Sequence, residues 1–138
     1  MADPPGSGKT WSALGMLHND KQFLKRCLIV APSYVLFQWK EAIESIKKYN
    51  KINWKIHYIR SIKQFNNTLF SSDKILFLLI SPSIMIKLKK TIKYFKFTHA
   101  IYDESHMYTR KRTQGWKALN EFARKISKRN LLITANPI

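Results

Sequence analysis

Short apolar runs alternate in this chain with segments of helical periodicity, and this alternation restricts the fold more than any other feature of the sequence. The predicted strands are Cys27–Ala31, Trp54–Ile59, Lys74–Ile80, Ala100–Asp103 and Leu131–Thr134. Most of these runs are apolar on both faces, which is typical of parallel strands buried between two layers of helices. Trp54–Ile59 alternates instead and predicts a half-buried strand. The chain is therefore expected to form a three-layer α/β domain around a mostly parallel sheet.

The segments between these strands have the spacing of amphipathic helices. The predicted helices are Thr10–Asn19, Tyr34–Tyr49, Ser83–Tyr94 and Gln114–Ile126. In the first of them, Trp11, Leu14 and Leu17 fall on one face. Ser33 precedes the second helix and is its expected N-cap. All four tryptophans of the chain are predicted to lie on core faces.

The charge balance is the unusual part of the composition. The 138 residues fit one domain, and they contain 25 Lys and Arg against 8 Asp and Glu, a formal net charge of +17. Such an excess attracts polyanions, nucleic acid first and anionic membranes second. The chain is also rich in Lys, Ile and Asn, a mixture that AT-biased coding produces, so drift in composition is an alternative source of part of this charge.

The sequence gives no sign of secretion or of a membrane-spanning segment. The longest strongly apolar run, Ile75–Ile80, is far shorter than the ~20 residues that cross a bilayer. The N-terminus has neither the basic start nor the apolar stretch of a signal peptide. Cys27 is the only cysteine, so an internal disulfide is excluded, and we expect it to be a small core residue. The expected setting is intracellular, in the nucleus or cytoplasm, with a viral origin left open.

A candidate phosphate-binding loop opens the chain. Residues 3–10 read D-P-P-G-S-G-K-T and match the pattern G-x-x-x-x-G-K-[ST], except at its first glycine. Gly6 and Gly8 allow backbone N–H groups to surround an anion, and the helix start behind them adds partial positive charge. Lys9 is then expected to reach the β- and γ-phosphates of a nucleotide, and Thr10 to ligate Mg²⁺. A Gly/Ser/Pro turn before a helix is the structural alternative.

Two adjacent carboxylates follow the strand predicted at Ala100–Asp103. Asp103 is expected to hold Mg²⁺ through water, and Glu104 to orient and polarise an attacking water. His106 stands where it could pass the phosphate state on to neighbouring segments. Because ligands bind at the carboxyl ends of parallel strands, this acidic box lies where a site is expected. An exposed loop with two solvated acids is the alternative.

Two other groups of residues have structural explanations that are favoured over functional ones. The four histidines and the cysteine have no metal-ligand spacing, which argues against a zinc site. The basic helix predicted at Ser83–Tyr94 would suit a membrane surface, but a helix packed on the sheet with a solvated basic face is favoured.

Taken in order, these segments resemble the motifs of superfamily 2 helicases, and among them the SWI/SNF-type DNA translocases. The segments that carry the resemblance are Met1–Thr10 (motif I), Leu28–Ile43 (motif Ia), Leu78–Ser83 (motif Ib), Tyr102–His106 (the D-E-A-H box) and Leu131–Ile138 (motif III). Asp3 matches the Asp that opens motif I in these translocases, and Pro32, Gln38 and Trp39 occupy matching places in motif Ia. The resemblance covers essentially the whole chain.

The resemblance implies a RecA-like phosphate-loop NTPase domain, the first motor lobe, over residues 1–138, with its first strand missing and the chain truncated at both ends. It implies ATP and Mg²⁺ as ligands and nucleic acid as the track, with DNA favoured over RNA. It also implies a second RecA-like lobe as a partner outside this chain, and no membrane. The implied residues are Pro5, Gly6, Ser7, Gly8, Lys9 and Thr10 for ATP; Thr10 and Asp103 for Mg²⁺; Lys9 and Glu104 for catalysis; Pro32, Ser33, Gln38 and Ser81 for nucleic acid; and His106, Thr134 and Ala135 for coupling.

The chain departs from the pattern of the family in three places. Asn136 replaces the usual Thr of motif III, which puts coupling in question, and Pro4-Pro5 replace Glu-Met in motif I. Ser105 replaces the Ala of the D-E-A-H box. The arginine finger that such motors use lies in the second lobe, so the isolated chain is expected to be an inactive ATP hydrolase.

The leading hypothesis is therefore the ATP-binding lobe of a nucleic-acid-dependent ATPase that couples hydrolysis to movement on DNA. One alternative is an ATP-independent, basic nucleic-acid-binding module derived from a decayed or split motor. Another is a different phosphate-loop enzyme, such as a small-molecule kinase or a DNA-packaging ATPase. The segments A-P-S…Q-W and T-A-N-P-I argue against that last class.

Overall fold

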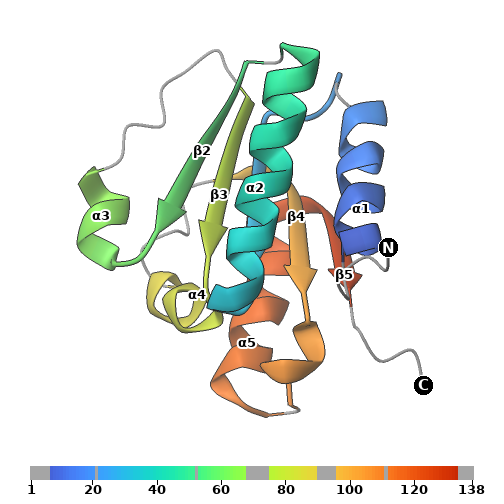
Figure 1. Cartoon of the computed structure of the whole chain (residues 1–138). Coiled ribbons are helices and arrows are strands. Elements are labelled where there is room, and N and C mark those ends of the chain that lie inside the picture. The colour runs from blue at the N-terminus through green and yellow to red at the C-terminus, as the bar shows by residue number, and fades with distance from the viewer. Residues whose placement is uncertain are drawn as a thin grey trace.

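A sheet of five parallel strands lies at the centre of the molecule (Figure 1). The computed structural model describes residues 7–20, 22–51, 53–67, 75–89, 96–110 and 112–133. The strand order is β2-β3-β1-β4-β5. The strands are β1 (Arg26–Val30), β2 (Trp54–Ile59), β3 (Ile75–Ile80), β4 (Phe97–Asp103) and β5 (Ser127–Ile133). Because every described pairing is parallel, the connections must cross from one end of the sheet to the other, and helices make most of these crossings.

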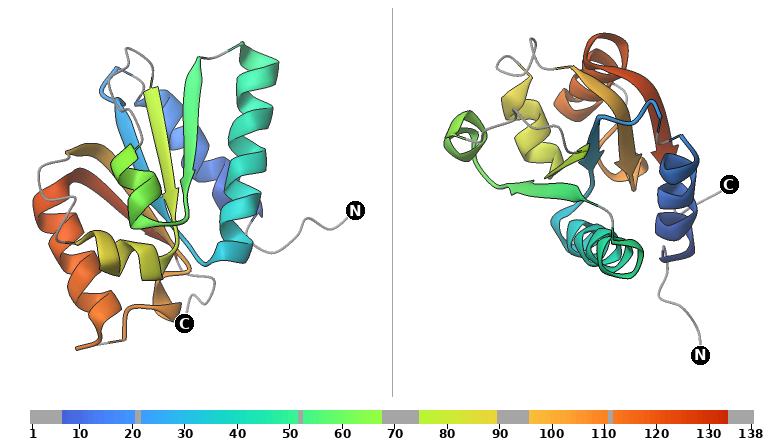
Figure 2. Two further views of the ribbon diagram at one scale, coloured as in Figure 1. Left: turned by 90° about the vertical axis from the view of Figure 1, so that its left-hand side faces the viewer. Right: turned by 90° about the horizontal axis from the view of Figure 1, so that it is seen from above.

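Helices cover both faces of this sheet, so the predicted three-layer α/β arrangement is confirmed (Figure 2). One face carries α1 (Ser7–Asn19) and α2 (Ser33–Asn50). The other carries α3 (Ile62–Asn67), α4 (Pro82–Leu88), α5 (Gln114–Glu121) and the π-helical turn η3 (Phe122–Ile126). A short 3-10 helix, η2 (Ser105–Met107), follows β4. The sequence pattern predicted neither α3 nor η2.

The central strands are buried because each face of the sheet belongs to a separate apolar core. In β1, Cys27 and Ile29 pack into the core beneath α1 and α2. Their neighbours Leu28 and Val30 point to the opposite core, beneath α4 and α5. This period-two division explains why β1 is a continuous apolar run rather than an alternating one. Burial raises the pKa of the Cys27 thiol, which behaves as the core residue that was expected.

Helix α2 carries the clearest apolar stripe. Leu36, Trp39 and Ile43 are spaced by three and four residues and are all fully buried. The helix begins at Ser33, so Ser33 is its first residue, and Pro32 occupies the N-cap position without a side-chain capping bond. The prediction of Ser33 as the N-cap is therefore wrong by one residue. Proline is tolerated at the start of a helix, because its φ is fixed near a helical value and the N–H that it lacks would have no partner within the helix.

Two of the four tryptophans were placed wrongly. Trp39 and Trp54 are buried as predicted. Trp11 is 49% exposed and Trp116 is 38% exposed. Both residues have the spacing of the apolar stripe of their helix, yet more than a third of each is exposed. Spacing alone does not define the width of the buried stripe.

Strand β5 differs from its prediction in length and in exposure. It begins four residues earlier than expected, at Ser127, and pairs with β4 from Phe97↔Ser127 to Asp103↔Ile133. Leu132 is 54% exposed, so this strand is not buried on both of its faces. In the described part of the sheet, β5 is an edge strand. An edge strand can remain partly exposed, which accounts for its polar residues followed by apolar ones.

The predicted basic helix is described only in its first part. Helix α4 runs over Pro82–Leu88, where the Ser81 hydroxyl accepts a hydrogen bond from the Ile84 N–H at 3.4 Å. Ile84, Met85 and Leu88 face the core, which agrees with the expectation of a helix packed on the sheet. The rest of the predicted helix, from residue 90 on, lies outside the described residues.

Candidate functional site

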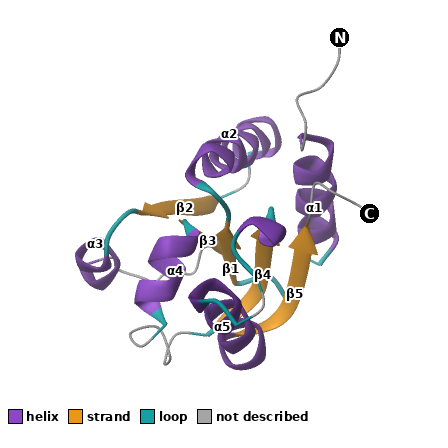
Figure 3. Cartoon of the chain, turned by 90° about the horizontal axis from the view of Figure 1, so that it is seen from below, coloured by secondary structure: helices purple, strands orange, loops and turns teal. Residues whose placement is uncertain are grey.

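The motif residues gather at one edge of the sheet, where the parallel strands end. The register pairs Val30 with both Ile80 and Tyr102, and Asp103 with Ile133, so β1, β3, β4 and β5 end at the same level. The segments that follow these strands lie together at this carboxyl edge, which Figure 3 views from below. Helix α1 also begins on this side of the sheet, and its start lies beside the tip of β5 in Figure 1.

The start of α1 contributes the described part of the predicted phosphate loop. The helix begins at Ser7, which places Gly8 and Lys9 in its first turn. Lys9 is exposed, whereas Thr10 is only 3% exposed. Pro5 and Gly6 lie outside the described residues, so the geometry of the loop itself is not described.

A groove of about 760 Å³ runs between the first half of α1 and the end of β5. Its wall on the helix includes Gly8, Lys9 and Ser12, and its wall on the strand is Leu131–Ile133. Ile133 is the register partner of Asp103. The groove therefore brings the start of α1 to the strand that neighbours the acidic box, although the two motifs are almost a hundred residues apart in sequence.

Asp103 ends β4 as a buried carboxylate held through both of its oxygens. Asp103 is only 6% exposed. Its Oδ2 accepts a hydrogen bond of 2.7 Å from the indole Nε1–H of Trp39. Its Oδ1 accepts a second one, of 2.8 Å, from the backbone N–H of Glu104. A carboxylate offers roughly four lone-pair positions, so two donors fix its orientation and leave acceptor capacity.

Glu104 follows in a strained backbone conformation. Its φ of 54° and ψ of 37° lie in the left-handed region, which non-glycine residues rarely occupy. Its carboxylate is largely buried, at 16% exposure, and lies 3.4 Å from Nε2 of His106. Strain of this kind persists only where the surroundings enforce it, and it is concentrated at functional sites.

Tyr108 ties this turn to the sheet, and the sequence interpretation missed it. Its hydroxyl lies 3.2 Å from the carbonyl oxygen of Val30 and 3.1 Å from that of Asp103, at the ends of β1 and β4. Burial, with the nearby Asp103 carboxylate, raises the pKa of Tyr108, so the hydroxyl stays a donor at neutral pH. An added Cβ at Gly115 would stand 1.9 Å from the Tyr108 carbonyl oxygen, so only glycine permits α5 to pack here.

The residues expected to touch nucleic acid lie at this edge, on two different helices. Pro32 and Ser33 form the start of α2, and Gln38 is exposed one turn further along it. Ser81 caps α4 and lies 3.1 Å, Oγ to Oγ, from Ser83. The edge thus presents two helix starts with hydroxyl-bearing side chains. Such starts donate N–H groups to phosphates in many proteins.

Of the residues expected to couple hydrolysis to movement, only His106 is described. Its side chain is 43% exposed beside Glu104. Thr134 and Ala135 lie outside the described residues. Ser105 connects the acidic box to motif III, because its hydroxyl approaches the carbonyl oxygen of Ile133, inside that motif, at 3.5 Å. At that distance the contact is a weak hydrogen bond.

A model of the SNF2-related domain family matches residues 1–138. The chain belongs to this family. The ATPase core of the Sulfolobus solfataricus SWI2/SNF2 protein, solved in complex with double-stranded DNA, has the same fold, with a TM-score of 0.67 at 19% sequence identity. The match covers 99% of this chain and 27% of that one, so the chain spans about a quarter of the length of that structure. No curated protein sequence matches the chain significantly.

These findings confirm the resemblance to SWI/SNF-type ATPases and the RecA-like fold. Within the described part of this SNF2-related domain, no helix is long and apolar enough to cross a membrane. Within the same residues, no cluster of three or more His, Cys, Asp or Glu is arranged to hold a metal ion.

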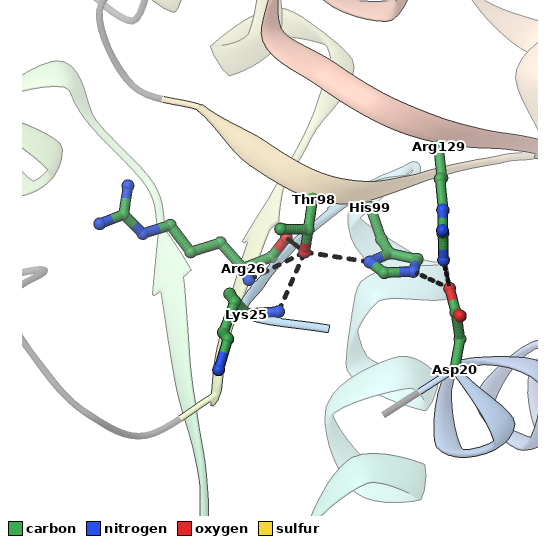
Figure 4. A network of polar contacts seen from close by, with 6 residues as sticks. All are labelled: Asp20, Lys25, Arg26, Thr98, His99 and Arg129. Atoms are coloured by element: carbon green, nitrogen blue, oxygen red, sulfur yellow. Dashed lines mark hydrogen bonds and ion pairs between the residues drawn. The ribbon is translucent and has the colours of Figure 1, made fainter. Parts of the chain in front are cut away.

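A second polar network of the SNF2-related domain lies at the opposite, amino edge of the sheet (Figure 4). Asp20, just after α1, binds Nε2 of His99 at 2.6 Å and pairs with the guanidinium of Arg129. These two partners lie on β4 and β5, so the network attaches the end of α1 to both strands. Hydrogen bonds from Arg129 and His99 lower the pKa of Asp20. Thr98 extends the network to β1 by accepting from the N–H of Arg26 at 3.2 Å.

Proposed function

We propose that this chain is the nucleotide-binding lobe of a DNA-stimulated ATPase, which binds ATP and Mg²⁺ at the carboxyl edge of the sheet. One observation carries the proposal: in a chain of the SNF2-related domain family, Lys9 at the start of α1 and Asp103 at the end of β4 flank the same end of β5. Helix starts favour phosphate groups, and hard oxygen ligands favour Mg²⁺. The full activity of such a motor requires segments that are not part of this chain.

The residues take distinct roles in this proposal. Lys9 neutralises the β- and γ-phosphates, within an ATP site formed by Pro5, Gly6, Ser7, Gly8, Lys9 and Thr10. Asp103 and the hydroxyl of Thr10 supply oxygen ligands that fit Mg²⁺, which offsets phosphate charge when bound. The donors on Asp103 support this role, because they orient the carboxylate and leave acceptor positions on it. Glu104 orients the attacking water.

Nucleic acid binds, in the same proposal, across the helix starts at Pro32, Ser33 and Ser81, with Gln38 beside them. His106, Thr134 and Ala135 respond to the phosphate state and relay it. The net charge of +17 supports a polyanionic partner. The similar Sulfolobus solfataricus ATPase core, solved in complex with double-stranded DNA, supports DNA rather than RNA.

The test is ATP binding by the chain and by two lysine variants. Lys9→Ala is expected to lose most of the binding of a fluorescent ATP analogue, because it removes the charge at the phosphates. Lys117→Ala is the matched control, since it removes the same charge from an exposed position on α5. Equal binding by the parent and both variants would refute the site. In the full-length protein, Glu104→Gln should still bind ATP but hydrolyse it about 100-fold or more slowly.

The charge of +17 also favours a second candidate, an ATP-independent nucleic-acid-binding module. Double-stranded DNA affinity measured over a range of salt separates the two. Both candidates predict a steep decrease in affinity as salt rises, because each neutralised phosphate releases a counterion. The motor lobe predicts that ATP changes the affinity and that Lys9→Ala abolishes this change. The ATP-independent module predicts equal affinity with and without ATP.

A further inference from the structure

The indole of Trp39 makes a contact that its place in the sequence does not explain. Trp39 occupies a core position of α2, between Leu36 and Ile43, where any large apolar side chain would serve. Instead its Nε1–H donates a 2.7 Å hydrogen bond to Oδ2 of Asp103, 64 positions away. Trp39 is fully buried and Asp103 is 6% exposed, so the hydrogen bond is shielded from water.

A hydrogen bond of this kind does more than fill space. A buried carboxylate attracts donors strongly, and a bond to an ionised acceptor is roughly twice as strong as one between neutral groups. The indole is rigid and its N–H direction is fixed by the ring, so Trp39 determines where Oδ2 can lie. With the Glu104 N–H on Oδ1, the carboxylate plane of Asp103 is fixed from both sides.

We propose that Trp39 is a positioning residue for Asp103, and that it presets this carboxylate for a divalent cation bound with ATP. This inference rests on the proposed function of Asp103. Trp39 does not touch the cation or the nucleotide. It removes rotational freedom from the carboxylate before the cation arrives, which lowers the cost of binding. Outer donors of this kind typically contribute 10–100-fold to metal affinity.

Trp54 provides a matched control inside the same chain. It is also buried, at 3% exposure, and its ring packs on Phe77 with centroids 4.9 Å apart. It begins β2, at the amino end of the sheet, far from Asp103 in the topology. Trp54→Phe and Trp39→Phe therefore remove the same atoms from two buried sites, and only one of the two variants loses a donor to the acidic box.

The decisive measurement is binding of a fluorescent ATP analogue as Mg²⁺ is titrated, with a parallel measurement in EDTA. Trp39→Phe is expected to raise the Mg²⁺ concentration at half-saturation about 10–100-fold, while binding in EDTA stays at the parent level. Trp54→Phe should match the parent in both. If Trp39→Phe has the Mg²⁺ dependence of the parent, or loses binding equally in EDTA, the positioning role is wrong. If the parent shows no Mg²⁺-dependent binding, the proposed function itself fails.

A second measurement needs no substitution at Trp39, in case Trp39→Phe does not fold. The four tryptophans give separate indole N–H signals in a proton–nitrogen spectrum, and Phe variants of the other three identify that of Trp39. Mg²⁺ with ATP is expected to shift the Trp39 signal and to leave the Trp54 signal in place, because only the acceptor of Trp39 binds the cation. An unchanged Trp39 signal at saturating Mg²⁺ and ATP would overturn the inference.

Discussion

The two ends of the sheet each hold an aspartate in a polar network, and the two aspartates have different kinds of partner. At the amino edge, Asp20 pairs with the Arg129 guanidinium and with His99, and this pairing lowers its pKa. At the carboxyl edge, Asp103 receives hydrogen bonds from neutral donors only, among the residues that the structure describes. Asp20 therefore has a charged partner within the fold, whereas the two described donors to Asp103, an indole N–H and a backbone N–H, carry no charge.

Under the proposed function, the network at the amino edge is structural and the carboxyl edge binds the ligand. A buried ion is costly unless it is paired, and a fold that needs only an attachment supplies the partner itself. The amino edge supplies a charged partner to Asp20, which is itself partly exposed, and this network joins the end of α1 to β4 and β5 (Figure 4). The carboxyl edge holds a buried carboxylate at fixed orientation beside a strained Glu104, which is the arrangement expected where the counter-charge is a bound cation. Substitutions at the carboxyl edge are therefore expected to change ATP binding more than stability, and substitutions at the amino edge to change stability more than ATP binding.

The largest expected effect comes from neutralising the carboxyl-edge acid. Asp103→Asn should weaken Mg²⁺-dependent binding of ATP by about 100-fold or more, equivalent to about 2.7 kcal/mol, because it removes a charged ligand. Its thermal midpoint should change little, since relief of a buried charge offsets the loss of one acceptor. Asp20→Asn should show the reverse: a lower thermal midpoint and unchanged ATP binding. Loss of ATP binding in Asp20→Asn alone would invalidate the comparison.

The next effect concerns how tightly the carboxyl edge is packed. Gly115→Ala places a Cβ 1.9 Å from the Tyr108 carbonyl oxygen, and both atoms belong to the backbone or are fixed to it. Overpacking of this kind typically costs about 1–3 kcal/mol of unfolding free energy. Gly15→Ala is the control, since its added Cβ meets no atom within 4 Å and alanine favours a helix. Urea unfolding of the two variants checks this, and equal stability would contradict the close packing described at Tyr108.

A smaller effect is expected from acid at the amino edge. The folded pKa of Asp20 is below that of the unfolded chain, so its contribution to stability is complete above about pH 4 and is lost as the pH falls through the folded value. Thermal midpoints followed from neutral pH to about pH 2 should therefore decrease less steeply for Asp20→Asn than for the parent. Parallel curves would mean that Asp20 has the same pKa in both states.

The smallest effect is expected at Ser105, where the chain departs from the usual D-E-A-H sequence. Its hydroxyl is 3.5 Å from the Ile133 carbonyl oxygen, too long for a strong hydrogen bond. Ser105→Ala, which restores the family residue, should change the unfolding free energy by less than about 0.5 kcal/mol. A loss well above this value would show that the hydroxyl stabilises the turn after β4.

The fold was largely predictable because burial leaves a periodic trace in the sequence. The apolar runs of β1 and β3 and the stripe of α2 gave the right elements within one or two residues. The start of β5 was missed because Ser127–Asn130 are polar and lie at a border of the described sheet, where pairing with β4 rather than burial defines the strand. Trp11 and Trp116 were misplaced because periodicity gives a direction but not the extent of the covering layer.

The motif residues of the candidate site were predictable from the sequence, but the contacts that hold them in place were not. Lys9, Asp103 and Glu104 stand out because their residue types and spacing match a known chemistry. The Trp39–Asp103 hydrogen bond joins residues 64 positions apart, and Trp39 fits the apolar stripe of α2 equally well as a core residue. The link between Asp20 and Arg129 is similarly distant in sequence. Neither contact alters the hydrophobic periodicity of the sequence around its residues, so only the tertiary structure could reveal it.

In the proposed function, ATP and a divalent cation bind at the carboxyl edge and leave the amino edge untouched. Replacing Mg²⁺ with paramagnetic Mn²⁺ tests it most directly, because Mn²⁺ broadens the amide and indole signals of nearby residues. With ATP present, Mn²⁺ is expected to broaden the signals of Glu104 and the Trp39 indole, and to leave those of His99 and the Trp54 indole sharp. Broadening centred on His99, or equal broadening at both edges, would contradict the assignment of the nucleotide site.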